Sequence, residues 1–299
     1  MLNIPSTIAQ QLNSANNILI LGLGGNDVLS GLPIYYNLVK EGKKIHLANI
    51  SNMDFKTLGD LSNPIVLDNN IVGVTGTVRV PTPGFTEGYL SQFFKASLNQ
   101  DIIVWLLNKM SVQETKVSLN RLIEHLKIDC ILLVDSGVDA MMQGNEGREI
   151  LTNKFVTTTV TLAAIQQMEG LQSKVFAVCV NNTTVNSNII SDNLSTLAVQ
   201  GGFLGGCFLL NFMISYKFLK GAYTYEVNNG QSIPEIEHLV KITDVDYEEN
   251  EIKPGLAQYL FFNPIALAYN NVAIHKILEA QNYFESVQLI APFINQVVI

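Results

Sequence analysis

The chain has 299 residues, of which 47% are apolar and only 15% are charged. This composition excludes a disordered protein, and the low charge is typical of a sheet buried on both faces. The formal net charge of −8 argues against the basic patch that nucleic-acid binding requires, so we expect no nucleic-acid partner. A chain of this length can bury a large core.

Three cysteines cannot all pair with one another. Cys130, Cys179 and Cys207 each lie in an apolar stretch, and their spacing matches no metal motif. This pattern favours buried, reduced thiols in a cytoplasmic protein. Residues 1–16 lack the basic start and apolar core of a secretory signal peptide, which agrees with a cytoplasmic location.

The hydrophobic pattern alternates between strand and helix periods through the first 180 residues. In chain order it predicts a strand over 17–23, a helix near 28–41 with Asp27 as its N-cap, a strand over 44–50, a hairpin over 64–74, a helix near 86–97, a strand over 102–107, a helix over 111–126, a strand over 129–134, helical segments within 146–168 and a strand over 174–180. The remainder is predicted to be mainly helical, apart from an apolar run over 259–262 and a terminal helix over 263–281.

Strands that alternate with helices through short connections indicate parallel strands and right-handed crossovers. We therefore predict a Rossmann-like α/β fold, with an open, mainly parallel sheet and helices on both faces. A single domain over 1–299 is the simplest organisation, with a core over about 15–220 and a helical C-terminal elaboration over about 221–299.

The segment 195–216 carries no charge and has about the length of a membrane span. Its glycines and the polar side chains of Gln200 and Asn211 lower its hydrophobicity. We expect a buried helix broken near Gly201 and Gly202, and no membrane partner. Membrane association of this segment is the alternative.

The first candidate site follows the strand over 17–23, where Gly24, Gly25 and Asn26 lead to Asp27. Asp27 stands where a dinucleotide fingerprint has its third glycine, and the strand over 44–50 ends without an acidic residue, so an ordinary NAD site is not expected. One interpretation is a glycine turn that binds a ligand, with Asp27 as general base or further ligand. The other is that Asp27 only caps the following helix.

The second and stronger candidate site follows the strand over 129–134. Asp135, Ser136, Gly137 and Asp139 are followed closely by Asn145 and Glu146. Clustered carboxylates of this kind suit magnesium or manganese, with Asp135, Asp139 and Glu146 as ligands, although the spacing is not that of an EF-hand. They suit hydrogen bonds to a sugar or an amino group equally well, and a capped turn with a solvated Glu146 is the structural alternative.

A third segment, 181–184, closes the strand over 174–180 with neutral polar residues. Because the carboxyl ends of parallel strands meet at one edge of a sheet, we expect Asn182 to add its amide to the same crevice.

These motifs resemble a family of uncharacterised bacterial and archaeal proteins, catalogued as domain of unknown function 1152. The resemblance rests on Gly24, Gly25 and Asp27 and on Asp135, Gly137, Asp139, Gly144 and Glu146. It implies a Rossmann-like fold and does not imply a particular reaction. The chain lacks further acidic positions that family members tend to have, at 147–150 and at 181–184.

The leading functional prediction is an enzyme that binds a small polar metabolite, such as a nucleotide or an amino-acid derivative. Asp27, Asp135 and Asp139 would be catalytic, with a magnesium or manganese ion supporting hydrolase, transferase or lyase chemistry. The alternative is a non-catalytic ligand-binding or protein-interaction module on the same scaffold. The apolar C-terminal residues 297–299 are expected to pair as an edge strand, either within the fold or across a homo-oligomer.

Overall fold

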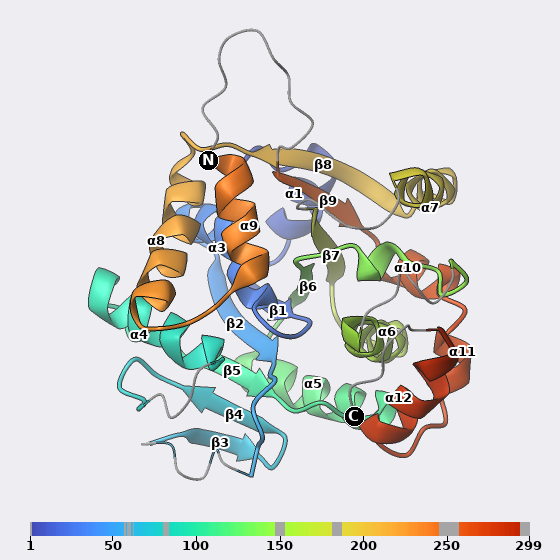
Figure 1. Cartoon of the computed structure of the whole chain (residues 1–299), viewed down its shortest axis with the longest axis horizontal. Helices are drawn as coiled ribbons and strands as arrows, with labels where there is room; N and C mark the ends of the chain where they lie inside the picture. Colours follow the sequence, from blue (N-terminus) through green and yellow to red (C-terminus); the bar gives the residue numbers. More distant parts are fainter. Residues whose placement is uncertain are drawn as a thin grey trace, which may run out of the picture.

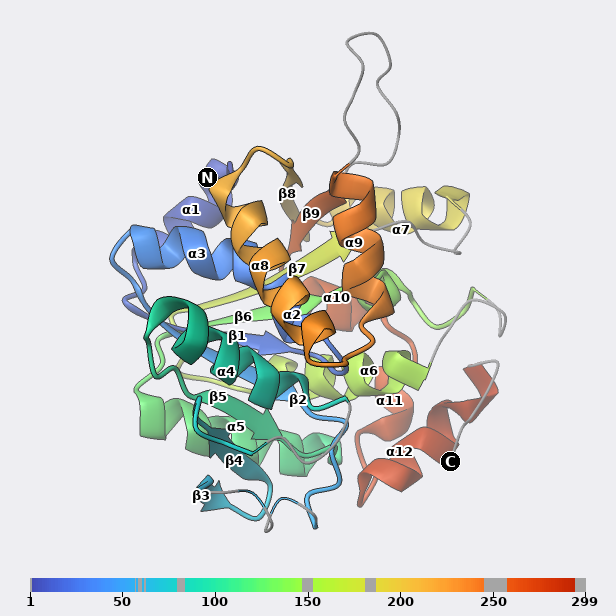
Figure 2. The same ribbon diagram turned by 60° about the vertical axis from the view of Figure 1, so that its left-hand side comes forward.

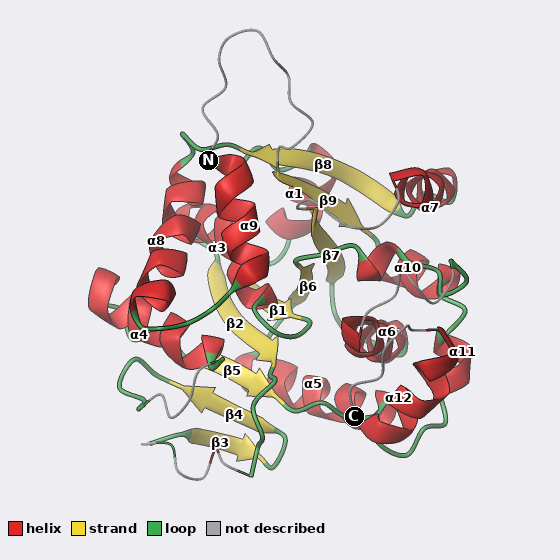
Figure 3. Cartoon of the chain, viewed as in Figure 1, coloured by secondary structure: helices red, strands yellow, loops and turns green. Residues whose placement is uncertain are grey.

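The computed structural model describes residues 2–56, 58, 61, 63–79, 84–146, 153–180, 187–244 and 257–293. Within these residues, nine strands form one mixed sheet in the order β3-β4-β5-β2-β1-β6-β7-β9-β8. Helices cover both faces of this sheet (Figure 1), and Figure 3 separates the helical layers from the strands by colour. The predicted α/β class, with a sheet that is parallel at its centre, is confirmed.

The central strands are parallel and hydrogen-bonded in the order β5-β2-β1-β6-β7. Their bounds are Asn17–Gly22 for β1, Lys44–Ile50 for β2, Val104–Leu107 for β5, Cys130–Asp135 for β6 and Ser173–Val180 for β7. The chain builds the sheet outward from β1 to β2 and β5, then returns to the other side of β1 with β6 and β7. Winding therefore reverses between β1 and β6, and ligands of open α/β sheets bind beyond the carboxyl ends of the strands at such a reversal.

Antiparallel strands extend both sides of this centre. The predicted hairpin forms β3 (Ile65–Asp68) and β4 (Ile71–Val74), and β4 pairs with β5. On the other side, β9 (Ala257–Phe262) lies between β7 and β8 (Phe203–Leu209). The C-terminal part of the chain is thus not only helical, since it supplies a strand inside the sheet.

Side chains that alternate along each central strand build a separate core on each face of the sheet. On β1, Ile18 and Ile20 join one core while Leu19 and Leu21 join the other. The first core packs under α1 (Ser6–Asn13), α2 (Asp27–Ser30), α3 (Leu32–Lys40), α4 (Thr86–Leu98), α8 (Ile214–Asn228) and α9 (Pro234–Thr243). The second packs under α5 (Val112–Leu126), α6 (Asn153–Gln166), α7 (Ser187–Val199), α10 (Pro264–Asn270), α11 (Ile274–Ile277) and α12 (Tyr283–Ile290), with short 3₁₀ turns at Asp139–Met141 and Ala291–Phe293.

The helix predicted within 195–216 is wrong, because this segment contains the end of α7, the strand β8 and the start of α8. Gly201 follows α7 with a φ of +71°, a left-handed conformation that ends a helix at little cost for glycine. Of the described helices, none is long and apolar enough to cross a membrane.

Three further predictions concern the cysteines, the terminal helix and the C-terminal residues. Cys130, Cys179 and Cys207 are free thiols and buried, as expected. The terminal helix predicted over 263–281 is divided into α10 and α11, which are separated by a turn at Asn271. The C-terminal residues 297–299 lie outside the described part of the chain.

Candidate functional site

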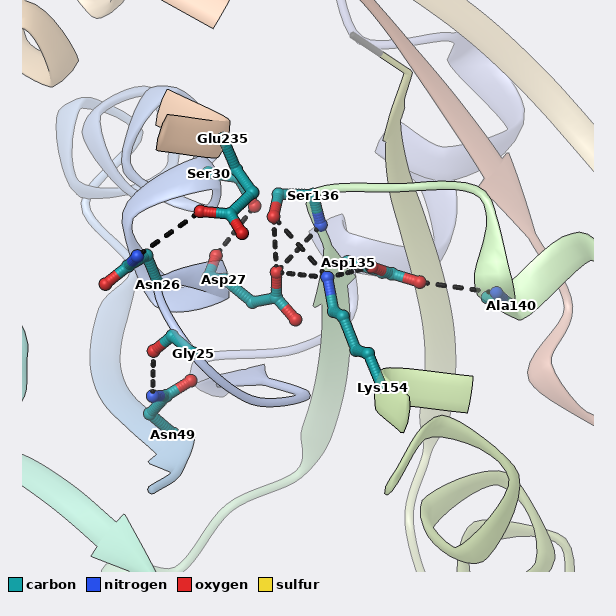
Figure 4. Close-up of polar contacts among 10 residues, drawn as sticks. All are labelled: Gly25, Asn26, Asp27, Ser30, Asn49, Asp135, Ser136, Ala140, Lys154 and Glu235. Atoms are coloured by element: carbon teal, nitrogen blue, oxygen red, sulfur yellow. Dashed lines mark hydrogen bonds and ion pairs between the residues drawn. The ribbon is translucent and has the colours of Figure 1, made fainter. Parts of the chain in front are cut away.

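A lysine joins the two predicted motifs at the carboxyl ends of β1 and β6 (Figure 4). Lys154, in the first turn of α6, places its Nζ 2.6 Å from Asp27 Oδ1 and 2.5 Å from Asp135 Oδ1. Ser136 donates to Asp27 Oδ1 through its backbone N–H at 3.0 Å and through its hydroxyl at 2.5 Å. Asp27 and Asp135 therefore meet at the reversal of the sheet, bridged by a cation.

Burial sets the electrostatics of this cluster. The exposed fraction is 1% for Asp27 and 0% for Asp135, while the Lys154 side chain keeps 25%. Burial raises the pKa of Asp27 to about 6 against the lowering effect of Lys154, and the Asp135 charge adds to the rise. Burial by itself would lower the pKa of Lys154, but Asp135 and Asp27 together hold that pKa above its ordinary value. Lys154 is therefore a fixed cation, and Asp27 titrates near pH 6.

The prediction that Asp27 caps its helix is wrong. Asn26 occupies the N-cap position of α2 and makes no side-chain capping bond. The Asp27 carboxyl group instead turns toward β6, where Ser136 and Lys154 contact its Oδ1. Its Oδ2 is buried without a hydrogen-bond partner among the described residues. Tertiary partners thus replaced the local capping role.

A cavity of about 460 Å³ opens beside Lys154. It is lined by residues that follow β1, β2 and β5 and by parts of α6, α9 and α12: Leu23, Gly24, Gly25, Asn52, Lys109, Lys154, Val156, Thr157, Glu235, Tyr283 and Val287. Of the four side chains in the cluster of Asp27, Asp135, Ser136 and Lys154, Lys154 alone lines this cavity. Within the described residues, the N–H groups of Gly24 and Gly25 have no acceptor. The predicted glycine turn therefore forms part of a concave site.

Lys109 is the second lysine of the cavity, and its surroundings differ from those of Lys154. Its Nζ lies 5.9 Å from the centroid of the Tyr283 ring. Within the described residues no carboxylate lies within salt-bridge distance of it. Burial lowers the pKa of Lys109. Tyr283 and Thr157 join their hydroxyl groups at 2.9 Å on the same wall.

Side-chain hydrogen bonds connect the glycine turn to neighbouring elements of the fold. Asn49, near the end of β2, donates through Nδ2 to Gly25 O at 2.9 Å and to Glu87 Oε1 at 2.8 Å. Asn26 donates through Nδ2 to Glu235 Oε2 at 3.5 Å. These bonds attach the turn to β2, to the first turn of α4 and to α9.

The structure does not assemble the predicted metal site of Asp135, Asp139 and Glu146. Glu146 accepts backbone N–H groups of its own loop, from Gln143 at 2.5 Å and Gly144 at 2.8 Å among others, so it folds back on the chain. Among the described residues, no group of three or more His, Cys, Asp or Glu side chains is placed to hold a metal ion.

The remaining predicted site residues lie in four different places. Gly137 lies beside the cluster, since a Cβ built on it would be 3.5 Å from Asp135 Oδ1. Asn145 is exposed and donates its backbone N–H to Glu146 at 3.1 Å, so it belongs to that loop. Asp139 begins a buried 3₁₀ turn. Asn182 lies outside the described residues.

Sequence reasoning missed both lysines. Lys154 stands in a predicted helical segment without any motif around it, and Lys109 follows a short strand in a polar turn. The sequence does contain one indication that a cation such as Lys154 lies at this site. Two aspartates predicted at adjoining ends of buried strands require a cation or a proton beside them. No comparable signal in the sequence marks Lys109.

Comparison of the chain with protein-family models, with curated proteins and with solved structures finds no match. The resemblance to domain of unknown function 1152 therefore stays a prediction.

Proposed function

We propose that the cavity binds a small polar metabolite with an acidic group, such as a nucleotide or an amino-acid derivative. The observation that carries this proposal is the contrast between its two lysines. Lys154 is paired with two buried carboxylates, whereas no described carboxylate pairs with Lys109. A half-buried cation without a counter-charge favours an anionic ligand group.

The glycine turn supports the same ligand class. The N–H groups of Gly24 and Gly25 are backbone donors on the cavity wall, and successive free N–H groups make concave sites for anions. An acidic group placed between this turn and Lys109 would meet donors from two sides. Glu235 and Asn52 on the cavity wall offer partners for amino or hydroxyl groups of the ligand.

Lys154 is the residue that we propose to touch the reacting atoms. Its ammonium group is fixed by Asp27 and Asp135, so it can stabilise negative charge that develops on a ligand oxygen without reorganising. Asp27 and Asp135 then act as positioning residues. Negative charge of this kind forms on an oxygen in hydrolysis, in group transfer and in a lyase reaction. We propose this role for Lys154 without a divalent metal ion.

A non-catalytic binding module remains the second candidate, and one observation favours it. Asp27, Asp135 and Ser136 are not among the residues that line the cavity, whereas Lys154 is. A module of this kind would bind the same anionic metabolites without turnover.

Thermal unfolding in the presence of nucleotides, amino acids and their phosphorylated or acylated derivatives tests the proposal. A ligand at ~100 times its Kd adds about 2.7 kcal/mol to the stability of the native state. We expect at least one acidic ligand to raise the Tm of the wild type and of the exposed control Lys276→Gln, and to lose most of this effect in Lys109→Gln. Turnover of that ligand, abolished in Lys154→Gln, would distinguish an enzyme from a binding module. An equal shift in Lys109→Gln would refute the cavity assignment.

A further inference from the structure

Two carboxyl groups lie buried together behind the glycine turn. Glu226, near the end of α8, has an exposed fraction of 0%, and Glu87, in the first turn of α4, has 1%. Helices α4 and α8 pack against each other, as the two ribbon views show (Figure 1 and Figure 2). The charge of Glu87 acts directly on Glu226. Two acidic side chains thus share one dry interface.

The two carboxyl groups differ in their partners. Glu87 accepts a hydrogen bond from Asn49, and its own backbone N–H and the Ser51 side chain also favour its charged form. Both oxygens of Glu226 are buried, and no described residue forms a hydrogen bond with them. Hydrogen bonds to a carboxylate stabilise its charge, so Glu87 is the group built to be ionised.

No cation compensates this pair within the described residues. Helices α2, α3, α4 and α9 pack against α8, and among their titratable groups Glu87 alone acts on the charge of Glu226. The others on those helices are Asp27, Tyr35, Tyr36, Lys40, Tyr89, Lys95, Glu235, Glu237, His238 and Lys241. Burial raises the pKa of Glu87, and burial and the Glu87 charge raise that of Glu226 well above its ordinary value.

We propose that Glu87 and Glu226 form a proton-binding site, in which one proton rests on Glu226 at neutral pH while Glu87 is ionised. Two like charges in a desolvated interface cannot both persist at low cost, and a proton is the ligand that this unpartnered carboxyl group can take without further donors. Proton binding at this site requires no particular ligand in the cavity.

This proton site is connected to the cavity. Asn49 bonds both Glu87 and the carbonyl oxygen of Gly25, and Gly25 lines the cavity. When Glu226 loses its proton, repulsion between the two carboxylates separates the ends of α4 and α8 and draws Glu87 away from Asn49. The glycine turn then loses its support, so proton release loosens the cavity wall.

The free energy of unfolding, measured with urea from pH 5 to 9 in the wild type and in Glu226→Gln, tests the proton site. A raised pKa in the folded state means that the wild type loses stability as pH rises from the ordinary glutamate pKa to the raised one. The neutral amide removes this loss. The folding equilibrium constant of Glu226→Gln relative to wild type should therefore increase about tenfold per pH unit in that range. The exposed control Glu124→Gln should show a constant ratio, and a constant ratio for Glu226→Gln would overturn the proposal.

Infrared spectroscopy of wild-type protein with isotope-labelled glutamate gives a test that needs no variant. The carbonyl band of a protonated glutamic acid should be present at pH 7, and its absence would overturn the proton site. Hydrogen exchange tests the connection to the cavity. Corrected for intrinsic rates, exchange over residues 24–26 should accelerate between pH 7 and 9 in the wild type and stay level in Glu226→Gln. Level exchange in both proteins would refute the connection.

Discussion

Asp27 and Lys154 are separated by 127 positions in the sequence, yet Asp27 Oδ1 lies 2.6 Å from Lys154 Nζ. This contact spans the reversal of the sheet, because Asp27 follows β1 while Lys154 begins the helix beyond β6. It pairs two buried aspartates, which would otherwise repel each other, with a cation whose side chain lines the cavity. The stability of this region and the chemistry proposed for it therefore depend on the same lysine.

Replacing Lys154 by methionine should destabilise the fold strongly. The change leaves Asp27 and Asp135 buried without their cation, and loss of one partner from a buried ion pair costs about 3–5 kcal/mol. Urea unfolding at pH 7 measures this loss. The control Lys241→Met removes an exposed pair with Glu237 and should change little. A loss for Lys154→Met as small as that of the control would contradict the assigned role.

The pH dependence of stability should reveal Asp27. Its pKa is raised from 3.8 to about 6 in the folded protein. The native state therefore binds this proton more tightly than the unfolded chain, and the resulting stability is complete below pH 3.8 and lost as pH rises through 6. The difference in unfolding free energy between Asp27→Asn and wild type should change between these values and be level above pH 7. A difference that is level throughout would show that Asp27 keeps its ordinary pKa.

Glu146 should prove to be structural. Its carboxylate accepts backbone N–H groups of Gln143 and Gly144 and the Asn193 amide, so Glu146→Gln places an NH₂ group among donors. We expect a loss of about 1–3 kcal/mol, measured by urea unfolding. The exposed Glu169→Gln serves as the matched control. Magnesium or manganese should raise the Tm of neither wild type nor variant, and a shift that depends on Glu146 would restore the metal-site prediction.

Two glycines near the site should differ strongly in how much stability they lose when replaced by alanine. A Cβ on Gly22 would lie 2.2 Å from Asn49 Oδ1 and 2.5 Å from Val28 N, so Gly22→Ala must displace the residue that supports the glycine turn. We expect a loss of at least about 2 kcal/mol. At Gly137 the nearest atom would be 3.5 Å away, and Gly137→Ala should change stability by less than about 1 kcal/mol. Thermal unfolding of the two variants gives the comparison, and equal losses would contradict it.

Local patterns predicted the parallel centre of the sheet well. Buried parallel strands are nearly continuous apolar runs, and β1, β6 and β7 have this character. The prediction of a helix at β8 fails for a local reason. The segment is uncharged and apolar, and such a run does not distinguish a buried helix from a strand. What decides there is pairing with β9, in which Phe208 lies opposite Gln258, 50 residues further along the chain.

The structure brings the two predicted motifs together at the expected edge of the sheet, and their role as a functional site stays a prediction. Asp27 and Asp135 do meet at the carboxyl edge, as their positions after two neighbouring strands implied. The sequence predicts Glu146 as a metal ligand, because its spacing does not reveal that backbone N–H groups of its own loop bind both of its oxygens. Lys109 has no signal in the sequence, since its environment includes the ring of Tyr283, which comes from a distant part of the chain.

The sequence by itself determined the α/β class, the central strands and the edge of the sheet at which glycines and carboxylates collect. Those features depend on periodicity and on residues close together in the chain, which short-range physics controls. Only the tertiary structure decided that Lys154 bridges the two aspartates, that Glu146 serves its loop, and that Glu87 and Glu226 share a dry interface. Each of these outcomes depends on burial and on partners far away in the chain, because desolvation sets the cost of a charge and the fold alone brings its compensating group within reach.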